Sequence, residues 1–155
     1  MSDTAWTTRS LEERDLPQIA SMAWDFGAEG DAAPVLTRKE FESSYREWGE
    51  GALRSAAYRG LVAVSRDRVV GFLWLAIVPR VPKPRATTRW TVDVQSVYVA
   101  PDSRRRGIGT ALITAARQTS DANVERLVAH TRRSALPAFR AWGFEPDELL
   151  IHRQP

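Results

Sequence analysis

The sequence predicts one α/β domain, with a mixed central β-sheet flanked by about four helices. The 155-residue length fits a single domain, which buries about two-thirds of its unfolded surface. Runs of β-branched residues alternate along the chain with amphipathic helical segments, in the order β-α-α-β-β-β-α-β-α-β. This order is typical of the α/β class. Because no repeat or linker interrupts it, we assign residues 1–155 to one domain.

The N-terminal part predicts a short strand followed by two helices. Residues 7–11 form the strand, and Asp15, followed by Pro17, is the expected N-cap of the first helix. A capping box at residues 37–40 starts the second helix, and residues 27–36 form the loop between them. Apolar residues at helical spacing form one face of each helix: Leu16, Ile19, Ala20, Ala23 and Trp24 in the first, and Phe41, Tyr45 and Trp48 in the second.

The middle of the chain predicts three strands. Residues 61–65 and 69–78 are apolar runs separated by the short polar turn at residues 66–68, which indicates a β-hairpin. A proline-rich basic loop, residues 79–88, follows the hairpin. Residues 90–99 then form a long strand rich in β-branched residues.

The C-terminal part predicts two helices, each followed by a strand. The helices cover residues 108–118 and 134–142, with Ser134 as the expected N-cap of the second. The strands cover residues 124–131 and 149–153. Most of the six tryptophans are expected in or near the core: Trp6, Trp24, Trp48, Trp74, Trp90 and Trp142.

The composition excludes several classes of function. The chain has no cysteine, which removes disulfides, thiolate metal sites and cysteine nucleophiles. Its two histidines, His130 and His152, lie far apart in the sequence, so we expect no metal. The longest apolar run, residues 69–78, is too short to span a bilayer, and the first residues lack the pattern of a signal peptide. We therefore expect a cytoplasmic protein with no membrane partner.

The net charge of +3 is unevenly distributed along the chain. Residues 12–50 contain ten acids and four bases, whereas residues 80–106 contain seven bases and two acids. These two regions are either solvated surface or complementary to ligands, with a polyanion near the basic region and a cation near the acidic one.

The segment RRRGIGT, residues 104–110, has the composition of a pyrophosphate-binding loop. It lies between a predicted strand and a predicted helix, and the first backbone N–H groups of a helix have no partners within it. The helix dipole adds about half a positive charge at the same place. Gly107 and Gly109 remove side chains where the backbone must approach a ligand, and three arginines surround them.

Other ligand-binding motifs fit this loop less well. A Walker loop and a Rossmann fingerprint both require a glycine where Leu112 stands. A nucleic-acid patch would explain the three arginines but neither the glycines nor the position between strand and helix, so we expect no nucleic-acid partner. A purely structural loop is the remaining alternative.

The loop resembles motif A of the GNAT N-acetyltransferase superfamily. That motif consists of arginine or glutamine, two residues, glycine, one residue, and glycine or alanine, which Arg104, Gly107 and Gly109 match. Further along the chain, AFRAWGF at residues 138–144 is similar to the family's closing motif. The resemblance covers residues 7–153 and implies a GNAT-like fold that uses acetyl-CoA as its acetyl donor.

The resemblance also implies a role for individual residues. Backbone N–H groups of residues 105–110 would hold the pyrophosphate, and the arginine side chains would neutralise it. Backbone groups of two strand residues would pair with the pantetheine amides, beside a splay between the fourth and fifth strands. Ten residues are expected to contact the cofactor: Val97, Val99, Arg104, Arg105, Arg106, Gly107, Ile108, Gly109, Thr110 and Phe139.

Two positions depart from the family pattern. Many members have an asparagine that contacts the cofactor and, seven residues later, a tyrosine that protonates the leaving thiolate; this chain has Arg132 and Phe139 there. Phenylalanine has no proton to give, so water or a hydroxyl elsewhere must supply it. Ser134 is one such hydroxyl, although a helix N-cap is its other expected role.

Asp93 is the candidate catalytic base. It is the one carboxylate within the strand sequence TVDVQSV, where a buried and unpaired charge would be costly. Asp93 therefore either forms a salt bridge with a neighbouring arginine or accepts a proton from the amine through water. Members of the family often carry a glutamate at this position for that purpose. Four weaker candidates are Gln95, Tyr98, His130 and His152, each of which is expected to serve packing or to lie on the surface instead.

The acceptor is expected near the first two helices, where Asp25, Glu29 and Asp31 would favour a small cationic amine. A peptide N-terminus or a lysine side chain fits the same region. A module that senses acetyl-CoA without catalysing a reaction is an alternative of a different class. A homodimer is left open.

Overall fold

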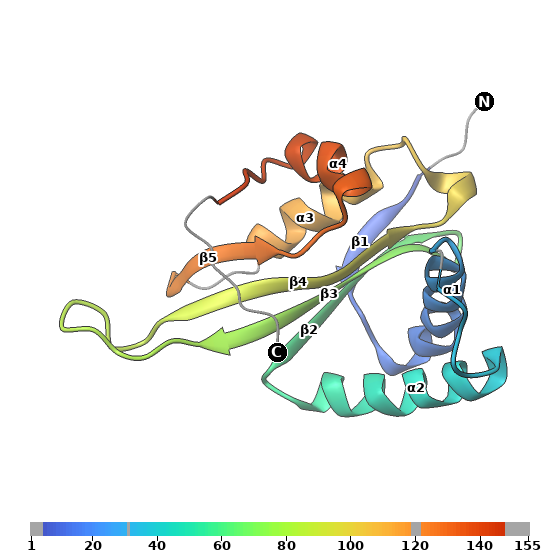
Figure 1. The fold of residues 1–155 in the computed structure, drawn as a ribbon, viewed down its shortest axis with the longest axis horizontal. Coiled ribbons are helices and arrows are strands. Elements are labelled where there is room, and N and C mark those ends of the chain that lie inside the picture. The colour runs from blue at the N-terminus through green and yellow to red at the C-terminus, as the bar shows by residue number, and fades with distance from the viewer. Residues whose placement is uncertain (1–4, 31, 119–121, 148–155) are drawn as a thin grey trace.

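A mixed five-stranded sheet forms the centre of the computed structural model, which describes residues 5–30, 32–118 and 122–147. The strands lie side by side in the order β1-β2-β3-β4-β5 (Figure 1). The first four pair antiparallel and β5 joins β4 in parallel, which confirms the predicted mixed sheet. Their bounds are β1 Thr7–Ser10, β2 Tyr58–Ser65, β3 Arg68–Pro79, β4 Trp90–Val99 and β5 Val124–Ala129.

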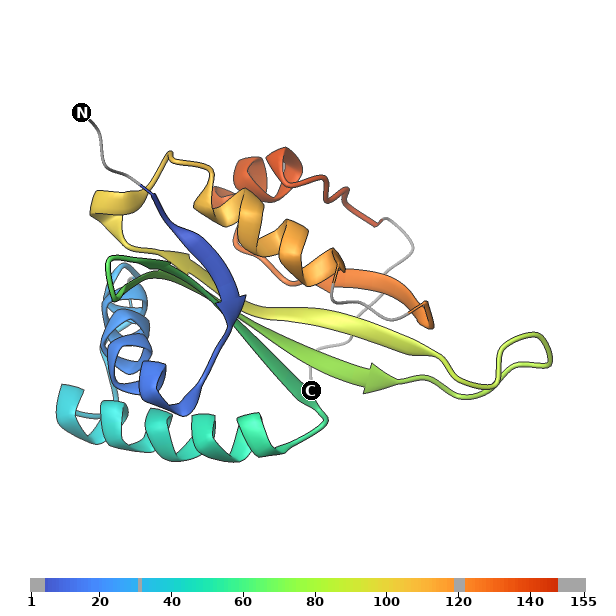
Figure 2. The same ribbon diagram turned by 180° about the vertical axis from the view of Figure 1, so that it is seen from behind.

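Two helices cover each face of the sheet (Figures 1 and 2). Helices α1, Leu16–Ala28, and α2, Arg38–Arg54, lie on one face. Helices α3, Ile108–Gln118, and α4, Leu136–Ala141, lie on the other. No helix of the described residues is long and apolar enough to cross a membrane.

Strand alternation gives each face of the sheet its own hydrophobic core. The α1/α2 face buries one set of side chains from the sheet: Val62, Val69, Phe72, Trp74 and Tyr98. The α3/α4 face buries the alternate set: Leu61, Ala63, Leu73, Leu75, Val92 and Val94. These two sets decide on which face of β4 a functional side chain lies.

Local signals in the sequence account for two of the connections. Thr37 and Glu40 form the predicted capping box, because the Thr37 hydroxyl accepts from the Glu40 N–H (3.3 Å) and Glu40 Oε2 accepts from the Thr37 N–H (2.8 Å). Arg66 and Asp67 form the hairpin turn with φ of 47° and 61°. Two consecutive left-handed residues are the geometry of the type I′ turn, one of the two turns that two-residue hairpins favour.

The two predicted helix caps differ from the prediction in their side chains. Asp15 stands at the predicted N-cap position of α1, but its side chain does not cap the helix: it is buried and accepts two bonds from Arg9, at 2.7 and 2.8 Å. A buried carboxylate needs a charged partner, and this pair supplies one. Ser134 lies within a 3-10 turn, Arg133–Ala135, that has no side-chain cap.

Several predicted boundaries also shift. Helix α1 continues to Ala28, into the predicted loop, and β5 ends at Ala129 rather than at residue 131. Of the tryptophans, Trp74 is fully buried, whereas Trp48 remains 42% exposed. The predicted strand at residues 149–153 lies outside the described residues.

Candidate functional site

The connection between β4 and α3 forms the entrance of the candidate site. A 3-10 turn, Pro101–Ser103, leads into a loop in which Arg105 and Gly107 have φ of 63° and 78°. Left-handed backbone is easy for glycine but costly for arginine, and such strain is typical of functional sites. A Cβ on Gly107 would meet no atom within 4 Å. The backbone of this loop therefore faces open space.

Helix α3 begins directly behind the loop. Its first bond joins the Ala111 N–H to the Gly107 carbonyl at 2.9 Å. The N–H groups of residues 107–110 precede that bond and have no acceptor within the helix. They lie at the positive end of the helix dipole, so the backbone alone favours an anion here.

A cavity of about 380 Å³ joins this loop to the end of β4. Eight of the ten residues expected to contact acetyl-CoA line it: Val97, Val99, Arg104, Arg105, Gly107, Ile108, Gly109 and Thr110. Five further residues complete the lining: Phe26, Glu29, Tyr98, Ala138 and Trp142. Arg106 and Phe139 are the two expected residues that are not part of it.

Strand β4 separates from β5 alongside this cavity. The parallel pairing runs from Trp90 with Val124 to Val94 with Ala129, where β5 ends. The register of β4 against β3 shifts at the same level, between the partners Trp74 and Leu75, so that Gln95 is an extra residue. The edge of β4 beyond this bulge, which includes Val97 and Val99, faces the gap and lines the cavity.

The carboxylate of Glu29, the residue directly after α1, contacts the loop arginine Arg104. Glu29 Oε1 accepts from Arg104 Nη2 at 2.7 Å and from the Tyr98 hydroxyl at 2.9 Å. The Arg104 guanidinium also lies 5.3 Å from the centre of the Tyr98 ring, and its Nε donates to the Val99 carbonyl at 3.0 Å. Burial, and then the bond to Glu29, raise the pKa of Tyr98 to about 12.

This cluster changes the expected roles of its members. Arg104 is held by Glu29 and the Val99 carbonyl, so a phosphate would have to compete for its side chain. Glu29 was expected to attract the acceptor, but here its charge is balanced by Arg104. Sequence reasoning missed the role of Tyr98, although the residue lies within the strand that leads to the loop.

The second glycine of the motif, Gly109, lies against a side chain, whereas the sequence suggests that it makes room for a ligand. A Cβ on Gly109 would lie 2.6 Å from Cζ2 of Trp142, so the indole occupies the space beside this glycine. The Trp142 ring in turn packs edge-on against Phe139, with centroids 5.1 Å apart. Phe139 is 7% exposed and belongs to the core of the α3/α4 face. Its position is that of a packing residue behind the cavity wall.

Asp93 points to the α1/α2 face, because its neighbours Val92 and Val94 both belong to the core of the other face. Its Oδ2 accepts from Gln95 Nε2 at 2.9 Å and lies 3.9 Å from His130 Nδ1. Its Oδ1 is buried and has no hydrogen-bond partner among the described residues. Burial raises the pKa of Asp93, and His130 and Gln95 oppose that shift. The partners are a histidine and a glutamine rather than a neighbouring arginine.

The remaining predicted groups lie around the same gap. Asp25 pairs with Arg38 at 3.2 Å, and Asp31 lies outside the described residues. Arg132, at the family's asparagine position, places its guanidinium 5.9 Å from the ring centre of Phe26, which lines the cavity. Arg132 therefore reaches across from the end of β5 to α1.

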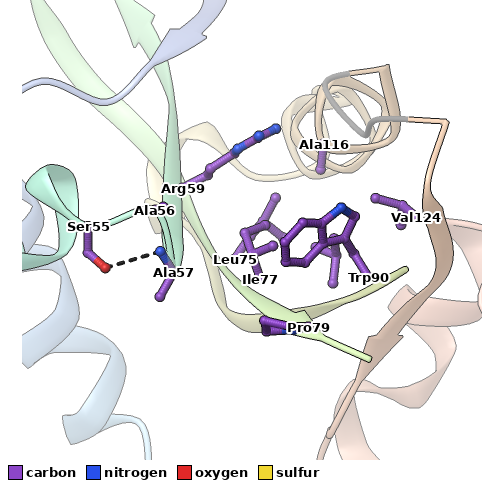
Figure 3. A pocket seen from close by; sticks show the side chains of 11 residues that line it. Ser55, Ala56, Ala57, Arg59, Leu75, Ile77, Pro79, Trp90, Ala116 and Val124 are labelled. Atoms are coloured by element: carbon purple, nitrogen blue, oxygen red, sulfur yellow. Dashed lines mark hydrogen bonds between the residues drawn. The ribbon is translucent and has the colours of Figure 1, made fainter. Parts of the chain in front are cut away.

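A larger cavity, of about 550 Å³, lies elsewhere on the α3/α4 face (Figure 3). The Trp90 ring lies at its centre, among Leu75, Ile77 and Val124, with Ala116 of α3 above. Among the described residues that line this cavity, Arg59 is the one ionisable group, and an arginine does not accept a proton from an amine. Among the described residues, no group of three or more potential metal ligands occurs.

A comparison with protein families shows to which family the chain belongs. The model of the acetyltransferase (GNAT) family matches residues 16–144, which include the loop, both strands at the gap and α4. The chain belongs to the GNAT acetyltransferase family. A comparison with curated protein sequences finds no match.

Solved GNAT structures share the fold at low sequence identity. An acetyltransferase from Trypanosoma brucei is 23% identical, with a TM-score of 0.69 over 97% of this chain and 100% of that chain. A predicted acetyltransferase from Clostridium acetobutylicum, with acetyl-CoA, is 14% identical, with a TM-score of 0.75 over 97% of this chain and 96% of that chain. An aminoglycoside acetyltransferase from an uncultured soil metagenomic sample, in complex with sisomicin, is 19% identical, with a TM-score of 0.69 over 100% of this chain and 98% of that chain.

Proposed function

We propose that this GNAT protein transfers the acetyl group of acetyl-CoA to a primary amine. The observation that carries the proposal is the single cavity that joins two features: the N–H groups at the start of α3, which have no acceptor within the helix, and the edge of β4 beyond its pairing with β5. A phosphate group fits the first of these and an extended amide chain fits the second. Acetyl-CoA contains a pyrophosphate group followed by the extended amide chain of pantetheine, which is the order of the two features along the cavity.

The residues of the cavity match the chemistry of this cofactor. Backbone N–H groups of residues 107–110 would bind the pyrophosphate, and Arg105, which lines the cavity, would balance its charge. Arg106 is an exposed residue of the same loop and would meet a phosphate from outside the cavity. Backbone groups of Val97 and Val99 would pair with the pantetheine amides. Bound acetyl-CoA supplies the acetyl group as a thioester.

Acetyl transfer forms a bond from the amine nitrogen to the acetyl carbon and breaks the bond from that carbon to sulfur. The amine must be neutral to attack, and it must lose a second proton once the new bond has formed. Asp93 lies one residue before the point where β4 leaves β5, close to where the thioester would end. We assign it the role of accepting protons through water, because a direct transfer from an amine of pKa about 10 to a carboxylate is strongly uphill.

The departing thiolate requires no side-chain acid in this proposal. Phe139 has no proton to give, and Ser134 lies at an exposed position in a 3-10 turn. Water at the open gap is the remaining donor. The same absence of an acid at position 139 supports the second candidate function, a sensor that binds acetyl-CoA and transfers nothing.

The acceptor in this proposal is a small cationic amine, and the α-amino group of a protein or a lysine side chain is the alternative. One structural neighbour is an aminoglycoside acetyltransferase in complex with sisomicin, a small molecule, which supports the first of these. Small amines also need less exposed surface around the gap than a folded protein does.

A thiol-release assay tests the proposal. The protein is mixed with acetyl-CoA and, in turn, with monoamines, polyamines and peptides, and free thiol is followed over time. The proposal expects release that depends on the amine and saturates with it. Binding of acetyl-CoA by calorimetry without amine-dependent release would favour the sensor instead.

A further inference from the structure

We propose that the acceptor is a primary amine carried on a flat apolar group, and that it lies in a trough on the α1/α2 face between an aromatic wall and Asp93. The wall consists of Trp48 from α2 and Tyr58 from β2, and Ala76 of β3 forms the floor. This inference rests on the proposed function and names the class of amine that the same site takes.

The register of the sheet places these residues in one row. Tyr58 pairs with Ala76, and Ala76 pairs with Asp93. Neighbouring strands lie about 4.8 Å apart, so the Cα atoms of Tyr58 and Asp93 are about 10 Å apart with a single methyl group between them. Ala76 is half-buried, so its methyl leaves that space open to solvent. A space of this width admits one aromatic ring with a short amine-bearing chain.

Aromatic rings form one side of the trough. Trp48 packs edge-on against Tyr58, with centroids 5.4 Å apart, and against the buried Trp74, with centroids 5.0 Å apart. Tyr45 fixes Trp74 from below, since the Trp74 Nε1–H donates to the Tyr45 hydroxyl at 2.9 Å. This support holds Trp48 in place even though 42% of its surface is exposed. A rigid and exposed indole is well suited to contact an aromatic or cationic ligand.

A carboxylate forms the opposite side. The Asp93 side chain is 21% exposed, and its buried Oδ1 has no partner among the described residues. The exposed part of this carboxylate would form a charge-assisted hydrogen bond with an ammonium placed here. Asp93 also lies next to the gap, because Val94, the following residue, is the last residue of β4 that pairs with β5. An amine held by Asp93 is therefore next to the place where the thioester would end.

The charges around the gap argue against a polycation. Recognition of several ammonium groups needs several unpaired carboxylates, yet Glu29 is bound by Arg104 and Asp25 by Arg38. Arg132 adds a positive charge at the same gap, beside Phe26. Among the described residues, Asp93 has no such arginine partner: it accepts from Gln95 and lies 3.9 Å from His130. One ammonium group is what this site can neutralise.

Binding of amines to the CoA-loaded protein tests the inference without relying on turnover. Phenylethylamine, butylamine and spermidine are titrated by calorimetry into the wild type, Trp48→Ala and Ala76→Leu. The first variant removes the wall, and the second fills the floor while it keeps the wall. Trp6→Ala is the matched control, because Trp6 packs on the opposite face of the sheet. Affinity for CoA is measured for every variant as a check on folding.

We expect phenylethylamine to bind more tightly than butylamine or spermidine, and both trough variants to weaken it about tenfold or more. The control is expected to bind it as the wild type does. Equal or tighter binding of spermidine, or unchanged binding by both trough variants, would overturn the inference. If phenylethylamine binds as expected but releases no thiol from acetyl-CoA, the trough stands and the proposed acetyl transfer fails.

Discussion

Replacement of Gly109 by alanine tests how α3 and α4 pack at the cavity. A Cβ at this position would lie 2.6 Å from Cζ2 and 3.1 Å from Cε2 of Trp142. Carbon atoms in contact lie about 3.5–4.0 Å apart, so the indole has to move. Its room to move is limited, because Phe139 packs edge-on against it.

Two opposing effects set the size of the change in stability. Forcing one extra methyl group into a packed contact costs about 1–3 kcal/mol. Alanine gains up to about 1 kcal/mol over glycine in a helix, and less at a terminus such as this one. The net loss is therefore about 1–2 kcal/mol, which lowers the melting temperature of a chain of this size by about 2–8 °C.

Thermal unfolding of two glycine variants measures this effect. Gly51→Ala is the matched control, because Gly51 lies in α2 and its Cβ would meet no atom within 4 Å. We expect Gly51→Ala to raise the melting temperature and Gly109→Ala to lower it. In a Trp142→Leu background the cost of Gly109→Ala is expected to disappear, since the indole that causes it is gone.

A stable Gly109→Ala variant would contradict this packing. If both alanine variants raised the melting temperature equally, the indole would not lie against Gly109. The glycine would then have to be explained by the cofactor alone, as the sequence first suggests.

Three further predictions concern individual side chains. Asp93→Asn is expected to lower kcat/KM by about 10²–10⁴ near neutral pH, with a deficit that shrinks at high pH, where the amine is already neutral. Because burial raises the pKa of Asp93, its charged form costs stability at neutral pH. The same variant is thus expected to melt at the same or a higher temperature than the wild type at pH 7. Any gain in melting temperature disappears below about pH 4, where the carboxyl group of the wild type is protonated in both the folded and the unfolded state. A lower melting temperature of the variant at pH 7 would indicate a structural ion pair. Phe139→Ala is expected to cost about 3–5 kcal/mol of stability, whereas Phe139→Tyr leaves kcat within about tenfold; a hundredfold gain would mean that a proton donor is missing. Glu29→Gln is expected to change the affinity for acetyl-CoA about two- to fivefold through Arg104, as an exposed ion pair allows, and to leave the KM of the acceptor unchanged; the reverse pattern would restore Glu29 to the acceptor site.

Periodicity and short-range signals made most of the fold predictable. The capping box at Thr37 and Glu40 involves residues three apart, so the sequence displays it directly. The strand that becomes β4 and the helix that becomes α3 match their predicted bounds, residues 90–99 and 108–118. Each has a strong apolar period and ends in residues that favour a turn. The loop between them could be placed because both of its neighbours could.

Contacts between distant residues could not be predicted in this way. Glu29 and Arg104 are 75 positions apart, and nothing in either local sequence indicates that they meet. Gly109 and Trp142 belong to different helices whose relative position depends on the whole α3/α4 core. The environment of Asp93 likewise depends on where β5 ends and on the bulge at Gln95. Such features follow from tertiary packing, which periodicity does not describe.

Calorimetric titration of acetyl-CoA into a pair of glycine variants tests the central claim that the loop at residues 104–110 holds the cofactor. Gly107 and Gly143 both have a left-handed φ, of 78° and 88°, and a Cβ on either would meet no atom within 4 Å. Valine at either position therefore strains the backbone to a similar degree without a steric clash, but only Gly107 lines the cavity. The account predicts that Gly107→Val weakens binding about tenfold or more, because several charge-assisted bonds to phosphate are disturbed, while Gly143→Val binds as the wild type does. Equal affinity of all three proteins for acetyl-CoA would contradict it.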